Sequence, residues 1–250
     1  MRLRVFRTAS EAAGAVAHRV ADHVTARPTA VLGLPTGRTS IAIYDELVRL
    51  QAAGQVDFAR VHTFNLDEFI SRPSRDRPSF RTFMDRHLFE RVNLPADHAH
   101  VLDGTAADLD AECERFEREI AAAGGIDLQI LGIGSNGHIG FNEPAKALSA
   151  RTHRARLTRQ TRRANAGLFG GRLTNVPREA LSMGMATILG ARAIVLVATG
   201  RSKSRAVQAM LAERITTSVP ASFLQLHRDV QIILDMAAAA RLTQVAENAT

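Results

Sequence analysis

A short apolar run that opens directly into a glycine-rich polar loop places the strongest constraint on how this chain can fold. Residues 128–133 read LQILGI, which predicts a buried strand. Glycines at 132, 134, 137 and 140 follow, so the loop can bring its backbone close to a ligand. A lone glycine-rich loop is often only a structural turn. This one also carries Asn136, His138, Asn142 and Glu143, and that density of polar groups favours a binding or catalytic loop.

His138 and Glu143 are the residues in this loop best suited to move protons. A histidine side chain can gain or lose a proton near neutral pH, and a nearby carboxylate can fix its tautomer and stabilise its charged form. The two residues are five positions apart in the same loop. The alternative is a structural turn in which the histidine merely caps a helix.

A second strand, turn and helix come earlier in the chain, where residues 29–34 read TAVLGL and continue into GLPTGRTS. Helical periodicity follows over residues 40–53. Backbone N–H groups and the helix dipole at such a junction can receive an anion. The turn has neither the Walker spacing nor the GxGxxG spacing of dinucleotide-binding loops. Thr36, Gly37, Arg38 and Thr39 are therefore candidates for binding phosphate, and a plain tight turn is the alternative.

A third junction, ATGRSKS, lies between a predicted strand at 193–198 and a predicted helix at 202–212. It puts Lys203 in the first turn of the helix, where a cation is unfavourable for the helix dipole unless an anion offsets it. Only two of the 32 basic residues are lysines, so this placement is informative. We expect Lys203 to contact an anionic substrate.

Two acidic residues, Asp67 and Glu68, come directly after a predicted strand at 60–66. The carboxyl ends of strands in α/β sheets face the crevice where ligands bind. We therefore expect both carboxylates to face that crevice. Acidic residues also cap helices often, and this is the competing interpretation.

The remaining pattern alternates strands and helices and predicts one α/β domain over residues 1–250. Two segments resist assignment: a polar loop at 71–78 and the arginine-rich stretch 146–174, which resembles a flap and is expected to act as a mobile lid. The further elements are strands at 2–6 and 230–234 and helices at 10–25 (N-capped by Ser10), 79–91, 107–123, 176–189 and 220–227.

Composition narrows the class of partner. No apolar stretch reaches the roughly 18 residues that span a bilayer, and the N-terminus lacks the apolar core of a signal peptide, so a cytoplasmic protein without a membrane partner is expected. Cys113 is the only cysteine, which excludes an intrachain disulfide and a cysteine-rich metal site.

The net charge of +7 raises the question of a nucleic-acid partner. The arginines are scattered, aromatic residues make up 5% and tryptophan is absent, which argues against a base-stacking surface. Attraction of a small phosphorylated substrate explains the charge more simply. The densest basic stretch, 151–163, is the best candidate for a basic patch, but a solvated face on a mobile segment is the favoured interpretation.

The three loops together resemble the glucosamine-6-phosphate deaminase (isomerase) family, and the match runs essentially end to end. It is carried by GLPTGRTS at 33–40, TFNLDEF at 63–69 and GIGSNGHIGFNEP at 132–144, with support from 161–166, 176–185, 200–203 and 220–227. The related 6-phosphogluconolactonases share the Gly-His loop but are expected to lack the FNEP continuation. The resemblance therefore favours the deaminase branch.

This resemblance implies a Rossmann-like, three-layer α/β domain with a mostly parallel sheet and helices on both faces. It also implies conversion of glucosamine 6-phosphate and water to fructose 6-phosphate and ammonia. Asp67 would be the base that moves a proton from C2 to C1, and His138 would open the sugar ring, oriented by Glu143 with Asn136 beside it. Residues 36–39 and Lys203 would hold the phosphate. Such acid–base chemistry needs no metal or other cofactor.

Several positions depart from the family pattern. Asn136 stands where many members have aspartate, and Gly167 stands where an arginine that helps to bind phosphate is expected. Arg38 replaces a small residue in the phosphate turn, and we hypothesise that it compensates for Gly167. Positions matching the allosteric site of hexameric members, Lys146, His153 and Ala155, match poorly. No activation by N-acetylglucosamine 6-phosphate is therefore expected.

Four alternatives remain open. Altered loops at 70–78 and 167–174 could reshape the sugar pocket for the galactosamine epimer. A lactonase would use His138 but have little need for Asp67, and a non-catalytic sugar-phosphate sensor would not need the carboxylates. Strongly salt-dependent DNA binding would favour a nucleic-acid-binding protein. Apolar helix faces serve a core or a homo-oligomer interface equally well, so the sequence leaves the oligomeric state open.

Overall fold

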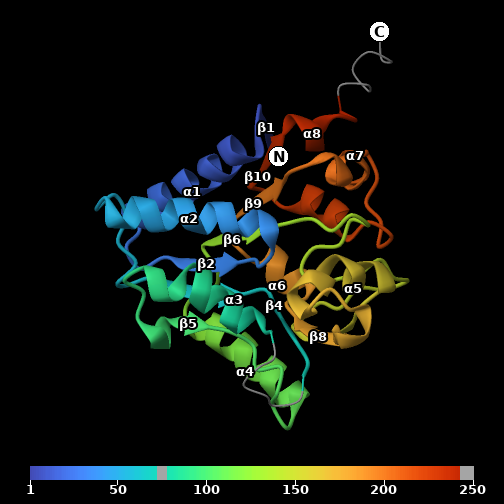
Figure 1. Ribbon diagram of the computed structural model, residues 1–250, viewed down its shortest axis with the longest axis horizontal. Helices are drawn as coiled ribbons and strands as arrows, with labels where there is room; N and C mark the ends of the chain where they lie inside the picture. The colour runs from blue at the N-terminus through green and yellow to red at the C-terminus, as the bar shows by residue number, and fades with distance from the viewer. Residues whose placement is uncertain (72–77, 243–250) are drawn as a thin grey trace.

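The computed structural model describes residues 1–71 and 78–242, and a seven-stranded parallel sheet runs through its centre (Figure 1). The strand order is β1-β10-β9-β6-β2-β3-β5. The central strands are buried on both faces, which explains why they read as continuous apolar runs. The strands are β1 (Arg2–Phe6), β2 (Val31–Leu34), β3 (His62–Asn65), β5 (Ala99–His100), β6 (Leu128–Leu131), β9 (Ala193–Ala198) and β10 (Val230–Asp235).

Helices cover both faces of this sheet and complete the three layers that the sequence predicted. Side chains alternate along β2, so that Leu32 and Leu34 pack into one apolar cluster and Val31 into the other. The first cluster contains α1 (Ala9–Ala26), α2 (Arg38–Ala52) and α3 (Phe80–His87). The second contains α4 (Leu109–Ala122), α6 (Met185–Leu189), α7 (Ser204–Leu211), α8 (Met236–Ala239) and the 3₁₀ helix η6 (Pro220–Leu226). No helix in residues 1–71 and 78–242 is long and apolar enough to span a membrane.

A smaller antiparallel sheet lies beside the large one, with strand order β4-β8-β7. It has its own aromatic core, in which the ring centroid of Phe69 lies 4.6 Å from that of Phe80 and 5.0 Å from that of Phe169. Its elements are β4 (Asp67–Phe69), β7 (His153–Arg156), α5 (Arg159–Asn165), η3 (Ala166–Phe169), η4 (Leu173–Asn175) and β8 (Glu179–Ser182). Three short 3₁₀ helices complete the fold: η1 (Phe89–Arg91), η2 (Ala96–His98) and η5 (Arg201–Lys203).

Three predicted elements differ from the structure. The helix predicted at 176–189 is confirmed only for α6 at its end, because residues 179–182 form strand β8, whose partners β4 and β7 come from distant parts of the sequence. The stretch 146–174 is more than a flap, since it forms β7 and α5 and buries Leu157 and Phe169. Its mobility stays a prediction. The first helix is capped by Thr8 in a capping box with Glu11, and not by Ser10. Most of the polar loop predicted at 71–78 lies outside the described residues.

The order of the strands places a ligand crevice at a defined point of the sheet. From β2 the chain continues outward through β3 to β5, whereas β6, β9 and β10 lie on the other side of β2. Connections that leave two neighbouring strands in opposite directions open a crevice at the carboxyl ends of those strands. The loops after β2 and β6 flank this point, and the loops after β3 and β9 lie next to them.

Candidate active site

Contacts between loops hold three of the four loops at this edge of the sheet together. The Lys203 ammonium donates a hydrogen bond to the backbone oxygen of Ile133 at 2.6 Å, which ties the turn after β9 to the loop after β6. The hydroxyls of Thr39 and Thr199 lie 3.2 Å apart and connect the turn after β2 to the turn after β9. The predicted phosphate turns therefore lie next to the loop that carries His138.

Glycine at position 134 allows the His138 ring to pack directly against the loop backbone. A Cβ atom at Gly134 would lie 2.4 Å from the imidazole, which no other residue type could accommodate without a shift. The Gly134 N–H donates to the His138 backbone oxygen at 2.8 Å, and the Gly137 N–H donates to the Gly134 oxygen at 3.0 Å. Gly137 has φ +87°, a left-handed conformation that favours glycine. The glycines therefore fold the loop back onto its own histidine.

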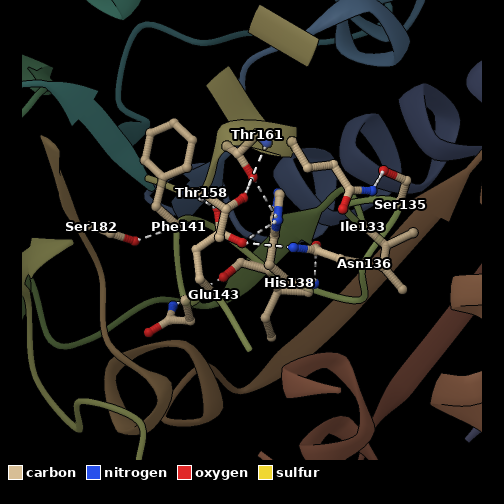
Figure 2. A network of polar contacts seen from close by, with 12 residues as sticks. Ile133, Ser135, Asn136, His138, Phe141, Glu143, Thr158, Thr161 and Ser182 are labelled. Atoms are coloured by element: carbon tan, nitrogen blue, oxygen red, sulfur yellow. Dashed lines mark hydrogen bonds and ion pairs between the residues drawn. The ribbon is translucent and has the colours of Figure 1, made fainter. Parts of the chain in front are cut away.

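His138, Glu143 and Asn136 form one connected group (Figure 2). His138 Nδ1 lies 3.3 Å from Glu143 Oε2, and the two side chains are 17% and 9% exposed. The Asn136 amide donates to the same carboxylate oxygen at 2.7 Å, while its oxygen accepts the His138 backbone N–H at 3.3 Å. The neutral amide thus holds both partners of the pair without adding charge.

The surroundings of Glu143 keep it ionised. Burial alone would raise the pKa of Glu143, but the hydrogen bond and charge of His138, together with hydrogen bonds from Thr161 and Asn136, lower that pKa to about 2. The carboxylate therefore orients the His138 ring with its proton on Nδ1, the nitrogen that faces it. This leaves Nε2 free for a substrate.

Asp67 lies in a very different environment. Its residue is 7% exposed, and among the residues that the structure describes no donor bonds to its carboxyl group. Burial, and then the charge of Glu68, raise the pKa of Asp67 to about 8. A carboxyl group with a pKa near the working pH can both accept and return a proton.

Glu68 does not share this role, and the prediction that both acidic residues face the crevice is wrong for it. Its carboxylate accepts the backbone N–H groups of Phe69 at 2.8 Å and of Phe80 and Arg81 at 2.9 Å each. Phe80 begins helix α3, whose first N–H groups have no partner within the helix. Glu68 therefore anchors α3 to strand β4.

Strand pairing fixes the position of Asp67, and Tyr44 lies on its other side. Its register partner in the small sheet is Ser182, whose hydroxyl accepts the Phe141 N–H at 3.0 Å in the loop that carries His138. On the other side, the buried Tyr44 hydroxyl donates to the backbone oxygen of Pro35, directly before the phosphate turn. Burial and then the charge of Asp67 raise the pKa of Tyr44, which places the two side chains near one another.

The turn at 36–39 has the features of an anion site. Gly37 has φ +113° and occupies the N-cap of α2 without a side-chain hydrogen bond. The Ser40 N–H donates to the Gly37 oxygen at 3.0 Å, and the N–H groups of Arg38 and Thr39 are left for a ligand. Burial, and then the charge of Arg38, lower the pKa of Lys203, so Arg38 lies near enough for its charge to act on Lys203. Within residues 1–71 and 78–242 neither forms an ion pair with a carboxylate. A phosphate would neutralise both.

Sequence reasoning missed four residues that support this site: Tyr44, Thr158, Thr161 and Ser182. The spacing of Thr158 and Thr161 is typical of the start of a helix and could have identified the cap of α5. Nothing local in the sequence indicates that these hydroxyls contact Glu143 and His138. Across the described part of the chain, no cluster of three or more His, Cys, Asp or Glu side chains could hold a metal ion.

Comparison with known proteins identifies the family of this chain. Residues 6–233 match the family model of glucosamine-6-phosphate isomerases/6-phosphogluconolactonase. The chain belongs to this family. A glucosamine-6-phosphate deaminase of Halothermothrix orenii is 47% identical over 223 residues, covering 89% of this chain and 92% of the relative. Glucosamine-6-phosphate deaminase 1 of Giardia intestinalis is 46% identical, covering 88% and 83%.

Solved structures with this fold differ in how similar their sequences are to this chain. The structure of a monomeric glucosamine-6-phosphate deaminase superposes with a TM-score of 0.92 at 39% identity, covering 96% of this chain and 99% of that one. A 6-phosphogluconolactonase of Thermotoga maritima shares 17% identity with a TM-score of 0.72, covering 94% and 98%. The lactonase therefore shows the shared fold alone, whereas the deaminases are also similar in sequence.

Proposed function

We propose that this chain is a glucosamine-6-phosphate deaminase, which converts glucosamine 6-phosphate and water to fructose 6-phosphate and ammonia. The observation that carries the proposal is its identity of 46–47% with deaminases of H. orenii and Giardia over nearly nine-tenths of the chain. The lactonase of T. maritima reaches only 17%. In this proposal, each step of the reaction has a group in the candidate site.

The phosphate binds at the turn after β2. Backbone N–H groups at the start of α2 and the cations of Lys203 and Arg38 receive its charge. The phosphate does not react, so the free energy of its binding serves to hold the sugar over the proton-transfer groups.

His138 opens the pyranose ring. With its proton on Nδ1 directed to Glu143, its free Nε2 takes the proton from the anomeric hydroxyl and delivers it to the ring oxygen. The ionised Glu143 stabilises the imidazolium that forms between these two transfers. Asn136 keeps the carboxylate in place throughout.

Asp67 then isomerises the open chain. Its carboxylate removes the proton from C2 to give a cis-enolamine, and the resulting carboxyl group returns that proton to C1. The product is an imine at C2, which water attacks to release ammonia and leave the ketose. The raised pKa of Asp67 suits this exchange, because both protonation states are accessible near neutral pH.

Ammonia release from the purified chain tests the proposal, with glucosamine 6-phosphate and galactosamine 6-phosphate supplied separately and the ketose assayed alongside. We expect ammonia and fructose 6-phosphate from the glucosamine substrate. Release only from galactosamine 6-phosphate, with tagatose 6-phosphate, would keep the mechanism and overturn the substrate. No ammonia from either sugar, with hydrolysis of 6-phosphogluconolactone, would overturn the deaminase assignment.

A further inference from the structure

Helix α5 directs two threonine hydroxyls at the pair formed by His138 and Glu143 (Figure 2). The helix belongs to the small sheet region, whereas the pair lies in the loop after β6. Two contacts of the His138–Glu143 pair therefore come from a segment outside its own loop. This arrangement is independent of the phosphate turn and of Asp67.

Thr158 holds one oxygen of the Glu143 carboxylate. Its hydroxyl donates to Glu143 Oε1 at 3.1 Å, and its backbone N–H donates to the same oxygen at 3.3 Å. As the N-cap of α5, the same hydroxyl oxygen accepts the Thr161 N–H at 3.2 Å. Oε2 is left for Asn136 and His138. Each carboxylate oxygen therefore has its own set of partners, and the carboxylate cannot rotate without losing them.

Thr161 contacts the histidine itself. It is 2% exposed, and its hydroxyl oxygen lies 3.4 Å from His138 Nδ1. A hydroxyl can accept from an Nδ1–H group while it directs its own proton to the Glu143 carboxylate. The Gln160 amide adds a further link between α5 and the loop by donating to the Ser135 hydroxyl at 2.8 Å. Docking of α5 therefore completes the hydrogen bonds around Nδ1.

We propose that Thr158 and Thr161 are positioning residues for ring opening, which hold the His138 proton on Nδ1 and keep Nε2 free for the substrate. The role in ring opening rests on the proposed deaminase function. Neither hydroxyl is placed to bind the phosphate or to exchange the C2 proton. Their loss should therefore slow turnover and leave substrate binding nearly unchanged.

The direct test replaces Thr161 with valine, which keeps the shape of the side chain and removes the hydroxyl. We expect Thr161→Val to lower kcat by about tenfold with KM within about twofold, because the hydroxyl that contacts His138 beside the ionised Glu143 is lost. Thr161→Ser, which restores the hydroxyl, should recover most of the activity. Thr152→Val is the matched control, since Thr152 is also buried and bonds to Glu117 at 2.7 Å, away from His138.

The position of the His138 proton can also be measured by NMR, without an activity assay. In ¹⁵N NMR of the full chain with labelled histidine, His138 is assigned by comparison with His138→Asn. We expect the neutral ring to carry its proton on Nδ1 in the wild type and in Thr161→Ser, and to become a mixture of tautomers in Thr161→Val. Failure of the wild type to release ammonia would overturn the proposed function, while this readout would still test the hydroxyl network.

The proposal would be overturned by a Thr161→Val variant with kcat within twofold of the wild type and an unchanged His138 tautomer. An equal loss of kcat in Thr152→Val would also overturn it, by showing a general effect of removing a buried hydroxyl. If Thr161→Val fails to fold, Thr158→Gly replaces it, because glycine still caps a helix but lacks the hydroxyl. A wild-type tautomer and kcat in Thr158→Gly would then refute the proposal.

Discussion

Asp67 is buried and Glu143 is partly buried at the same edge of the sheet, yet their ionisation is opposite. Glu143 has donors on both oxygens, from Thr158 on one side and from Asn136 and His138 on the other. Asp67 has no bonded donor among the described residues. The pKa falls to about 2 for Glu143 and rises to about 8 for Asp67. Burial and donors decide the charge together, because burial still raises the pKa of Glu68 to about 7 although Glu68 accepts three backbone N–H groups.

The two environments suit two kinds of work. A carboxylate whose charge is fully satisfied stays ionised and can hold a histidine in one tautomer. A carboxyl group without donors changes its protonation easily and can carry a proton between two carbons. Pairs of titratable groups whose surroundings push their pKa values apart are a common basis for assigning acid and base roles.

The largest expected effect comes from removing the exchangeable proton at Asp67. Asp67→Asn should lower kcat by about a thousandfold or more, since general acid–base catalysis contributes about 10²–10⁴-fold. Ammonia release measured at saturating glucosamine 6-phosphate checks this. Glu68→Gln is the matched control, because Glu68 is the residue next to Asp67 and its carboxylate anchors α3 to strand β4. If both variants lost activity equally, the distinction between the two adjacent carboxyl groups would be wrong.

A smaller loss is expected from Glu143→Gln, which keeps the shape of the side chain and removes its charge. We expect kcat to fall by about 10- to 100-fold, because the imidazolium formed during ring opening loses its counter-charge. KM should change little. Steady-state kinetics on Glu143→Gln and Asp67→Asn in parallel would compare the two roles, and a KM increase as large as the kcat loss would place Glu143 in substrate binding instead.

Binding of the phosphate should be separable from both carboxyl groups. Lys203→Ala should raise KM by about tenfold or more, because a desolvated charge-assisted contact is lost. Arg38→Ala, which removes a more exposed cation, should raise KM by less. Both variants should keep kcat within about threefold of the wild type at saturation. An unchanged KM in Arg38→Ala would remove Arg38 from phosphate binding and refute its compensation for Gly167.

The smallest expected effects are on the stability of the fold. The contributions of Asp67 and Glu143 change with pH in opposite directions. The folded state binds the Asp67 proton up to a pKa of about 8, against an ordinary value of 3.8, so stability falls as pH rises between these values. Glu143 stabilises the fold above its ordinary pKa of 4.5, and this contribution is lost as pH falls towards about 2.

Thermal unfolding of the two variants measures these slopes. At pH 7, Asp67→Asn should raise Tm by roughly 2–4 °C and Glu143→Gln should lower it by a similar amount. The gain in Asp67→Asn should disappear near pH 4. A Tm of Asp67→Asn below that of the wild type at pH 7 would contradict the conclusion that the buried Asp67 carboxyl group lacks a hydrogen-bond donor.

The sequence predicts the large sheet well, because each central strand is buried on both faces and its neighbours come from regularly spaced segments. Runs such as TAVLGL at 29–34 and the buried strand at 193–198 need no long-range information. The small sheet is different. Strand β7 reads HRAR with two exposed arginines, and β8 carries a sequence that also fits a helix. Only pairing with distant strands decides their conformation.

Prediction of the site from the sequence is limited in the same way, because some of its contacts join distant parts of the chain. Its loops are visible in the sequence because glycines and polar residues follow apolar runs, and the structure gathers Asn136, His138 and Glu143 within one loop. Local sequence could not separate Asp67 from Glu68, because the donors that occupy Glu68 come from residues at the start of α3. Nor could it assign Thr161 to His138, 23 positions away, because that contact depends on how α5 docks.

The most direct test of the contrast between the two carboxyl groups is their titration by ¹³C NMR in the full chain, with side-chain carboxyl labels assigned through Asp67→Asn and Glu143→Gln. We predict that the Asp67 carboxyl titrates well above pH 6 and that the Glu143 carboxyl stays ionised down to about pH 3. Titration of both groups near pH 4, within about one pH unit of each other, would contradict the account.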